Sequence, residues 1–256
     1  MKIATWNLES CKELTTEFEE AFRKAIYDRD ADVWVLTETW LNFSLVGYQL
    51  VAQTCQADDL IYAKRPFSRW VAIWSRLKSR KLEVLSDPER MACIRVEEGV
   101  RPVVVVGTVL PWGDDKRHPP KKGIPKKEAA AAEFCQMLHA QSEEWRHLWC
   151  NPDATGFCIA GDFNQRSLHF PKPDGNNRHA CINEAFKGLD CLTDGMKVVY
   201  PKAKKNTDPR LPTIDHICVG GGLKMRPSTE PETWTVPMIG QSAVTDHAGV
   251  AVDLFF

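Results

Sequence analysis

The stretch FCIAGDFNQ, residues 157–165, joins an apolar run to a polar turn. Its first four residues are apolar and predict a buried strand. A glycine, a carboxylate and a carboxamide follow directly, as Gly161, Asp162 and Asn164. Because Gly, Asp and Asn all favour turns, these residues could simply end the strand. The alternative is that the strand delivers Asp162 and Asn164 to a functional site, and the rest of the chain decides between the two.

Polar residues also stand at the ends of four other predicted strands. They follow IATW and VWVLT, and they lie within TIDHICV and TDHAGVAV. Each residue taken singly fits a turn or an exposed strand end. Loops at sheet edges usually build functional sites, so the five strand ends together favour one site. Besides Asp162 and Asn164, the set comprises Asn7, Glu38, Asp215, His216, Asp246 and His247.

This set contains the groups that cleavage of a phosphate ester requires. A hard cation that neutralises the phosphoryl oxygens needs oxygen ligands. The attack also needs a base near the water, a hydrogen-bonding group near the phosphate and a group that stabilises the developing charge. A histidine stabilises this developing charge best when a carboxylate fixes its tautomer and favours its charged form. The matching residues are Glu38 and Asp246 for the metal, Asp162, Asn164 and His247 for the phosphate and its attack, and Asp215 for the histidine.

The remaining pattern predicts a mixed α/β chain with two sheets. A β-α-β opening spans residues 2–39, with apolar residues at helical spacing between residues 12 and 30. Closely spaced strand patterns follow between residues 48 and 110 and favour antiparallel pairing. Helices are predicted over residues 126–149 and near 181–189. Further strands are predicted over residues 213–219, 232–236 and 249–256.

Length and composition limit the class of protein. With 256 residues, 43% of them hydrophobic, the chain can bury a full core, and we expect a single domain over residues 1–256. No apolar stretch approaches the ~20 residues of a membrane span and the N-terminus lacks a signal-peptide core, so we expect a cytoplasmic protein. We also expect a monomer. Nine cysteines without a CxxC pair favour reduced thiols over a disulfide framework or a zinc site.

Two basic stretches adjoin the predicted site strands. Residues 116–127, KRHPPKKGIPKK, follow GTVLP and contain no acid, and residues 197–210, KVVYPKAKKNTDPR, lead into LPTIDH. A net charge of -1 excludes a globally basic nucleic-acid binder, so any nucleic acid would be recognised locally. Charge runs are often only solvated loops. A basic rim over a phosphate-cleaving centre would nevertheless attract a polyanion, and we expect Lys121 and Lys122 to bind the substrate.

The ordered series TWN, TET, GDFN, IDH and TDH resembles the endonuclease/exonuclease/phosphatase superfamily, which includes pancreatic deoxyribonuclease and the apurinic-site endonucleases. The motifs run from residue 5 to residue 247, and RWVAIWSR and RMACIRVE stand where that family has core strands. The resemblance implies a four-layered α/β sandwich, with two packed mixed or antiparallel sheets flanked by helices. It also implies a phosphoric ester hydrolase that depends on Mg²⁺ or Mn²⁺.

The resemblance assigns the metal to three residues. Glu38 would be the principal ligand, Asp246 would assist it, and Asn7 would contact the metal or the phosphate. Many members of the family carry Gln before the metal-binding Glu, whereas this chain carries Thr37.

The resemblance assigns the attack on phosphorus to four further residues. Asp162 would orient or deprotonate the water, with Asn164 beside it on the phosphate. His247, paired with Asp215, would stabilise the pentacovalent transition state. This interpretation explains the opening stretch, because the turn after Ala160 would then deliver two side chains to the scissile phosphate.

The chain departs from nuclease members of the family in VVVVGTVLPWGD, residues 103–114. Before the proline, those members usually place a Tyr or a His that contacts the phosphate or the leaving group. The candidates here are Thr108 and Val109, and Thr108 can donate a hydrogen bond but cannot act as an acid near neutral pH. The leaving group would then take its proton from water, from metal-bound water or from another residue such as His118.

We therefore expect a phosphodiesterase of nuclease type that acts on DNA or RNA. An alternative is a phosphatase of small or lipid-linked phosphates, because GDFNQR, with Arg166 as a further phosphate-binding candidate, and LPTIDHI resemble the inositol polyphosphate phosphatases. The chain lacks their tryptophan before GD and carries His216 in place of their arginine. A second alternative is a non-catalytic nucleic-acid-binding relative, which the complete set of acids and histidine disfavours.

Overall fold

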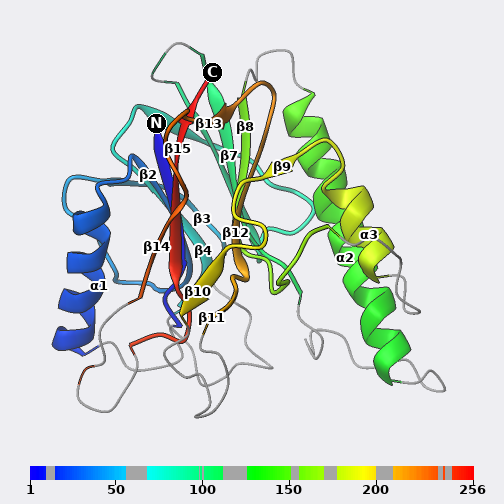
Figure 1. The fold of residues 1–256 in the computed structure, drawn as a ribbon, viewed down its shortest axis with the longest axis horizontal. Helices are drawn as coiled ribbons and strands as arrows, with labels where there is room; N and C mark the ends of the chain where they lie inside the picture. Colours follow the sequence, from blue (N-terminus) through cyan, green and yellow to red (C-terminus); the bar gives the residue numbers. More distant parts are fainter. Residues whose placement is uncertain are drawn as a thin grey trace.

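The computed structural model places two β-sheets face to face, with helices on both outer faces (Figure 1). This arrangement confirms the four-layered α/β sandwich that the sequence predicts. The structure describes residues 1–9, 15–55, 68–97, 99, 101–111, 126–150, 156–169, 178–199, 210–235, 239 and 244–256.

The first sheet places the N-terminal and C-terminal strands side by side. Its order is β13-β15-β1-β2-β4-β3, and β14 pairs with β15. Strand β1 runs parallel to β2 and antiparallel to β15, so residues at opposite ends of the chain meet at one end of the sheet. The strands are β1 (Lys2–Asn7), β2 (Val33–Trp40), β3 (Gln49–Gln53), β4 (Ser68–Ser75), β13 (Lys224–Met225), β14 (Glu232–Trp234) and β15 (Gly249–Phe255).

The second sheet has the order β5-β6-β7-β8-β12-β9. Strand β8 runs parallel to β7 and antiparallel to β12. Two short strands, β10 (Lys197–Val199) and β11 (Arg210–Pro212), pair separately. The strands of the second sheet are β5 (Ser79–Leu82), β6 (Met91–Val96), β7 (Val103–Val109), β8 (Gly156–Asp162), β9 (Asp190–Cys191) and β12 (Asp215–Gly220).

Helix α1 (Thr16–Arg29) covers the outer face of the first sheet (Figure 1). It begins after Thr15, whose hydroxyl accepts a hydrogen bond from the backbone N–H of Phe18. Its buried Phe22 and Ile26, four residues apart, pack against the tryptophans of that face.

Helices α2 (Lys126–Trp149) and α3 (Arg178–Ala185) cover the outer face of the second sheet. The predicted bounds of α2, residues 126–149, are confirmed. No described helix combines the length and the apolar character that a membrane span needs.

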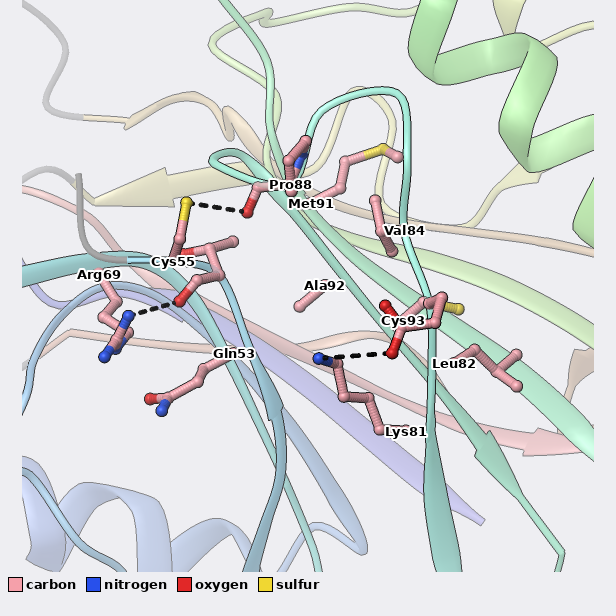
Figure 2. Close-up of a pocket in the computed structure, with 12 residues that line it drawn as sticks. Gln53, Cys55, Arg69, Lys81, Leu82, Val84, Pro88, Met91, Ala92 and Cys93 are labelled. Atoms are coloured by element: carbon pink, nitrogen blue, oxygen red, sulfur yellow. Dashed lines mark hydrogen bonds and ion pairs between the residues drawn. The ribbon is translucent and has the colours of Figure 1, made fainter. Parts of the chain in front are cut away.

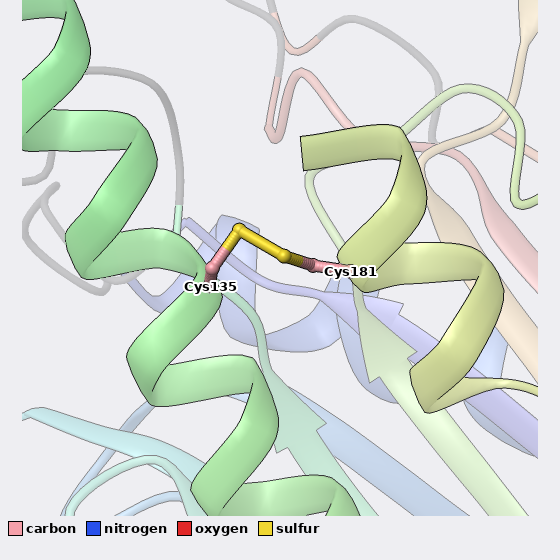
Figure 3. The surroundings of a disulfide bond; sticks show 2 residues. All are labelled: Cys135 and Cys181. Carbon is pink, nitrogen blue, oxygen red and sulfur yellow. A yellow bond between two sulfur atoms is a disulfide. The ribbon is translucent and has the colours of Figure 1, made fainter. Parts of the chain in front are cut away.

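A disulfide bond between Cys135 and Cys181 joins α2 to α3, with 5.7 Å between their Cα atoms (Figure 3). The expectation that the cysteines are reduced thiols is therefore wrong for this pair. The two residues are 46 positions apart in the sequence, and only the packing of the helices brings them together. The other cysteines in the described part of the chain are free, namely Cys55, Cys93, Cys150, Cys158, Cys191 and Cys218.

Gly161 explains how β8 can approach β7 where the opening stretch begins its turn. Its φ of +147° lies in a region that side-chain-bearing residues rarely adopt. A Cβ at this position would also lie 1.9 Å from the backbone oxygen of Thr108. Glycine is therefore required directly before Asp162, at the end of the sheet.

Candidate active site

The polar residues of interest continue the rows of side chains that face the core between the two sheets. On β8, Cys158 and Ala160 belong to this core, and Asp162 is the next residue in the same row. On β12, Asp215 precedes Ile217 in the corresponding row. Strand β1 ends its own row at Asn7. The candidate site therefore lies where the apolar core between the sheets ends.

Asn7 connects the two sheets. Its side chain is fully buried, and Nδ2 donates to Oε1 of Glu38 at 3.2 Å and to Oδ2 of Asp162 at 3.0 Å. Its Oδ1 accepts a hydrogen bond from the backbone N–H of Glu9 at 2.8 Å. Because all these bonds form at once, Asn7 fixes the two carboxylates beside each other, one from each sheet.

His247 and Asp215 form a second unit beside Asp162. Nδ1 of His247 lies 2.7 Å from Oδ2 of Asp215, which is fully buried. The Thr245 hydroxyl accepts from the His247 backbone N–H and donates to the backbone oxygen of Asn7. The opposite ring nitrogen, Nε2, lies 3.9 Å from Oδ2 of Asp162. The imidazole therefore has a fixed orientation and faces the carboxylate that Asn7 holds.

The turn after β8 is closed by its own side chains. Oδ1 of Asp162 accepts from the backbone N–H of Asn164 at 2.9 Å. Nδ2 of Asn164 donates to the backbone oxygen of Leu110 at 3.0 Å, which connects the turn to the end of β7. The first bond forms the Asx turn that Asp favours, so residues 161–164 are a turn as well as part of the candidate site.

Three non-glycine residues with left-handed backbone lie at this site: Glu9 at φ +50°, Glu38 at +48° and Asn164 at +53°. Only two other described non-glycine residues, Asp30 and Ser228, have positive φ. Such conformations cost on the order of 1–3 kcal/mol each and persist where the surroundings impose them. In β2, regular alternation would turn the Glu38 side chain towards α1, and the left-handed residue instead brings it to Asn7.

The charges of the site shift two pKa values. Burial would lower the pKa of His247, but attraction by Asp215, Asp162 and Asp246 outweighs it and raises the pKa to about 10. Burial raises the pKa of Asp162 to about 7, although the neighbouring His247 acts in the opposite direction. His247 is therefore an imidazolium at neutral pH, and Asp162 titrates in the range that suits a general base.

The donor set fits a hard divalent cation. Among the described residues, Asp162, Asp215 and His247 offer ligand atoms that all lie within 4.8 Å of one another. The hydrogen bond between Asp215 and His247 already uses one atom of each, which favours an orienting role for that pair over direct ligation. The carboxylate of Glu38, which Asn7 holds beside Asp162, remains as an oxygen ligand of the kind that Mg²⁺ or Mn²⁺ prefers.

The substrate-binding candidates Thr108 and Arg166 each have a partner within the protein. Thr108 is fully buried, and its hydroxyl donates to Oε1 of Gln141 on α2 at 2.9 Å. The expectation that it contacts a phosphate is not supported, because Gly107 faces the core between the sheets and alternation turns Thr108 to the α2 side. Val109 is fully buried in the core between the sheets. Arg166 is exposed, and its Nη1 donates to the backbone oxygen of Pro212 at 2.7 Å.

Three further candidates belong to the basic stretch of residues 116–127. Lys121, Lys122 and His118 lie outside the described residues. Asp246 is in the site, with 44% of its side chain exposed and Oδ1 at 3.8 Å from Nε2 of His247.

The sequence reasoning missed Glu9. Its Oε2 accepts from the backbone N–H of Asp246 at 3.0 Å, so Glu9 connects the end of β1 to the segment that carries His247. The signal that could have identified Glu9 is its carboxylate, which stands two positions after Asn7.

The cavity shown in Figure 2 lies near the ends of β3, β4, β5 and β6. Its volume is about 370 Å³, and its polar lining includes Arg69, Lys81 and Glu83. Arg69 Nη1 donates to the backbone oxygen of Thr54 at 2.7 Å, and the Cys55 thiol lies 3.5 Å from the oxygen of Pro88. None of the residues assigned to phosphate chemistry lines this cavity, so its size alone does not identify the reacting centre.

The chain was compared with known proteins. A model of the Endonuclease/Exonuclease/phosphatase family matches residues 4–247. No curated protein matches. Similar solved structures include D. rerio TDP2 complexed with a single-strand DNA product, at 13% identity and a TM-score of 0.67, covering 100% of this chain and 99% of that one.

Two further solved structures have the same fold. The AP endonuclease LMAP from Leishmania major is 15% identical, with a TM-score of 0.65, covering 98% of this chain and 86% of that one. A functionally unknown protein from Enterococcus faecalis is 14% identical, with a TM-score of 0.61, covering 100% of this chain and 99% of that one. At these identities the likeness establishes the fold and leaves the substrate to be argued from the site.

Proposed function

The chain belongs to the endonuclease/exonuclease/phosphatase family, and from that premise we propose that it is a divalent-metal-dependent phosphodiesterase of nuclease type. One observation carries the proposal. Asn7 holds the carboxylates of Glu38 and Asp162 together, and the His247–Asp215 pair faces the same Asp162 oxygen. The cluster thus contains an acid–base group in Asp162, a fixed positive charge on His247 and a hard oxygen ligand in Glu38.

The proposed metal-binding residues are Glu38, Asp246 and Asn7. Mg²⁺ or Mn²⁺, when bound, would neutralise charge on the phosphoryl oxygens. Glu38 would be its principal ligand and Asp246 would assist. The amide of Asn7 donates to Glu38 and Asp162, so its main contribution is to fix the direction of both carboxylates.

The proposed attack uses Asp162, Asn164 and His247. Asp162 would accept a proton from the attacking water, which its raised pKa permits near neutral pH. Asn164 would orient the phosphate from the adjoining turn. The charged His247, held by Asp215, would stabilise negative charge on the phosphoryl oxygens as the transition state forms.

A nucleic acid is the proposed substrate. The basic stretches at residues 116–127 and 197–210 adjoin strands that lead to the site. The second stretch begins in β10 and ends at the first residue of β11, and β11 is followed after two residues by Asp215 at the start of β12. Local positive charge beside a phosphate-cleaving centre suits a polyanion. Two similar structures are also of a DNA-bound TDP2 and of an AP endonuclease.

A substrate panel tests the proposal. Single-stranded DNA, duplex DNA, abasic DNA, RNA and phosphoinositides would be incubated with Mg²⁺ or Mn²⁺ and the products resolved. The Asp162→Asn protein, purified in parallel, controls for contaminating nuclease. Cleavage of a nucleic acid by wild type alone supports the proposal. Release of phosphate from a phosphoinositide alone would favour the phosphatase, and binding without any turnover would favour the non-catalytic relative.

A further inference from the structure

His216 is a buried histidine that the proposed chemistry does not use. It follows Asp215 on β12 and is fully buried. Because successive side chains of a strand alternate, Asp215 faces the site and His216 faces the α2–α3 side, as does Cys218. Its ring lies 5.5 Å from that of Phe163, in the turn that follows β8.

Both ring nitrogens of His216 have partners. Nε2 lies 2.7 Å from the backbone oxygen of Gln165, which is 51 positions away in the sequence. Nδ1 lies 3.2 Å from Oγ1 of Thr193 and 3.7 Å from Sγ of Cys191. Carbonyl oxygen only accepts hydrogen bonds, so Nε2 must carry a proton. The neutral tautomer and the imidazolium both satisfy this condition, and the bond to Gln165 therefore does not depend on the charge of His216.

Thr193 completes the arrangement from the other side. Its hydroxyl oxygen accepts the backbone N–H of Ile217 at 3.0 Å, and its proton is available for Nδ1 of His216. The imidazole is thus held between β9, the segment after it and β12, with Nε2 directed at the turn. A buried ring with both nitrogens hydrogen-bonded has a fixed orientation.

The turn that receives this bond carries the proposed base and phosphate-binding residue. Gln165 directly follows Asn164, whose backbone is left-handed, and Asp162 opens the same turn. Phe163 N–H donates to the backbone oxygen of Ile214, the residue before β12, so Ile214 and His216 together contact the turn at two backbone atoms, the nitrogen of Phe163 and the oxygen of Gln165. Asp162 pairs with Asp215 in the sheet, so the bond from His216 adds a contact at the other end of the turn, at Gln165.

We propose that His216 is a positioning residue, which fixes the turn of residues 162–165 through its Nε2–H bond to the Gln165 carbonyl. The inference rests on the proposed function, since the turn matters because it carries Asp162 and Asn164. A displacement of about 1 Å at a reacting group can lower the rate by ~100-fold, so a residue that positions the turn from outside the reacting centre can still control kcat.

Two amide substitutions separate the ring nitrogens. The Nε2 amide of glutamine stands at the same number of bonds from Cα as Nε2 of histidine, whereas the amide of asparagine corresponds to Nδ1. We expect His216→Gln to keep kcat within ~3-fold of wild type and His216→Asn to lower kcat by ~10-fold to ~100-fold. KM and the metal concentration for half-maximal activity should change by less than ~3-fold in both. Cys191→Ala, which removes a neighbour of Nδ1 and leaves the bond from Nε2 to Gln165 in place, is the matched control and should retain wild-type kcat.

A second readout does not need activity. Amide hydrogen exchange of the segment around residues 162–166 should be faster in His216→Asn than in wild type and His216→Gln, while the unfolding midpoints of both variants agree. This comparison still decides the positioning role if the wild-type protein cleaves no phosphodiester, which would count against the proposed function alone. Equal loss of kcat in both variants, unchanged exchange in His216→Asn, or a pH profile altered in His216→Gln would each overturn the proposal.

Discussion

At the scale of single residues, the site depends on the charges of Asp162 and His247, whose charged forms burial disfavours. The opposite charges of Asp162 and His247 stabilise each other against the cost of burial, and Asp215 orients the imidazole. Their pKa shifts are typical of functional sites, where groups are tuned for proton transfer rather than for stability. Substitutions here should therefore change activity far more than folding.

Asp162→Asn should lower hydrolysis by ~100-fold to ~10,000-fold, because the amide keeps the shape of the side chain but cannot accept the proton of water. The unfolding midpoint should stay close to that of wild type. Turnover of the preferred substrate and thermal unfolding would be measured together. Asp253→Asn, on β15 away from the site, is the matched control and should keep wild-type turnover. Wild-type turnover in Asp162→Asn would remove the assigned base.

His247 should make stability depend on pH. Its folded-state pKa of about 10 lies above the ordinary value of 6.5, so its charge stabilises the fold. This contribution is complete below pH ~6.5 and is lost as the pH rises through ~10. In the presence of a chelator, the free energy of unfolding of wild type should fall across this window relative to His247→Gln. Parallel pH curves for the two proteins would contradict the assigned charge.

Glu38→Gln should raise the metal concentration needed for half-maximal activity by ~10-fold or more, because the amide lacks the charge that holds a hard cation. A titration with Mg²⁺ gives this value, and chelation should stop the wild-type reaction. Glu232→Gln, an exposed carboxylate on β14, is the control. Activity that survives complete chelation would exclude the metal mechanism.

At the scale of elements, patterns local to one segment predicted the structure well. Helical spacing over residues 126–149 predicted α2, and the apolar run of residues 157–160 predicted the buried strand β8. The short strands β10 and β11 were read only as part of a basic stretch, because three residues each carry too little periodicity. The orientation of the Thr108 side chain follows from Gly107 facing the opposite sheet, a contact that no single segment encodes.

Contacts between elements are likewise absent from local patterns, and the disulfide is one of them. Cys135→Ser should lower the free energy of unfolding by ~2–4 kcal/mol, since the crosslink closes a loop of 46 positions in the unfolded chain. Turnover should be unchanged, because neither cysteine contacts the site residues. Denaturant unfolding with and without a reductant measures the loss. Cys150→Ser, which removes an exposed free thiol, should have no effect. Equal stability of wild type and Cys135→Ser would show that the crosslink contributes nothing.

At the scale of the whole molecule, the site forms where two sheets meet, from strands at the beginning, middle and end of the chain. Asn7, Asp162 and His247 come together only because β1 lies beside β15 and packs across the core from β8. The sequence order of the motifs could indicate this meeting, since the family pattern spans residues 4–247. The choice of substrate depends instead on the charge around the site. The two basic stretches appear in the sequence, and most of their residues lie outside the described part of the chain.

The basic stretch of residues 116–127 separates a nuclease from a phosphatase of small substrates. If it follows a nucleic-acid backbone, changing Lys121 and Lys122 to Ala should weaken binding to long DNA or RNA, because each lysine neutralises a phosphate and releases a counterion. The slope of log K against log salt should become shallower by about one unit per lost contact, so by about two units in the double variant.

A small chromogenic phosphodiester provides the internal comparison for this double variant. It is too short to reach beyond the reacting centre, so its turnover should remain near wild type while cleavage of long nucleic acid falls. The matched control changes Lys24 and Lys187 to Ala, two exposed lysines whose side chains are 76% and 75% accessible, and should leave both the salt slope and the turnover unchanged. Equal loss on both substrates would indicate a damaged fold. An unchanged salt slope on nucleic acid would show that the stretch is only a solvated loop, and the polyanion argument for a nuclease would then fail.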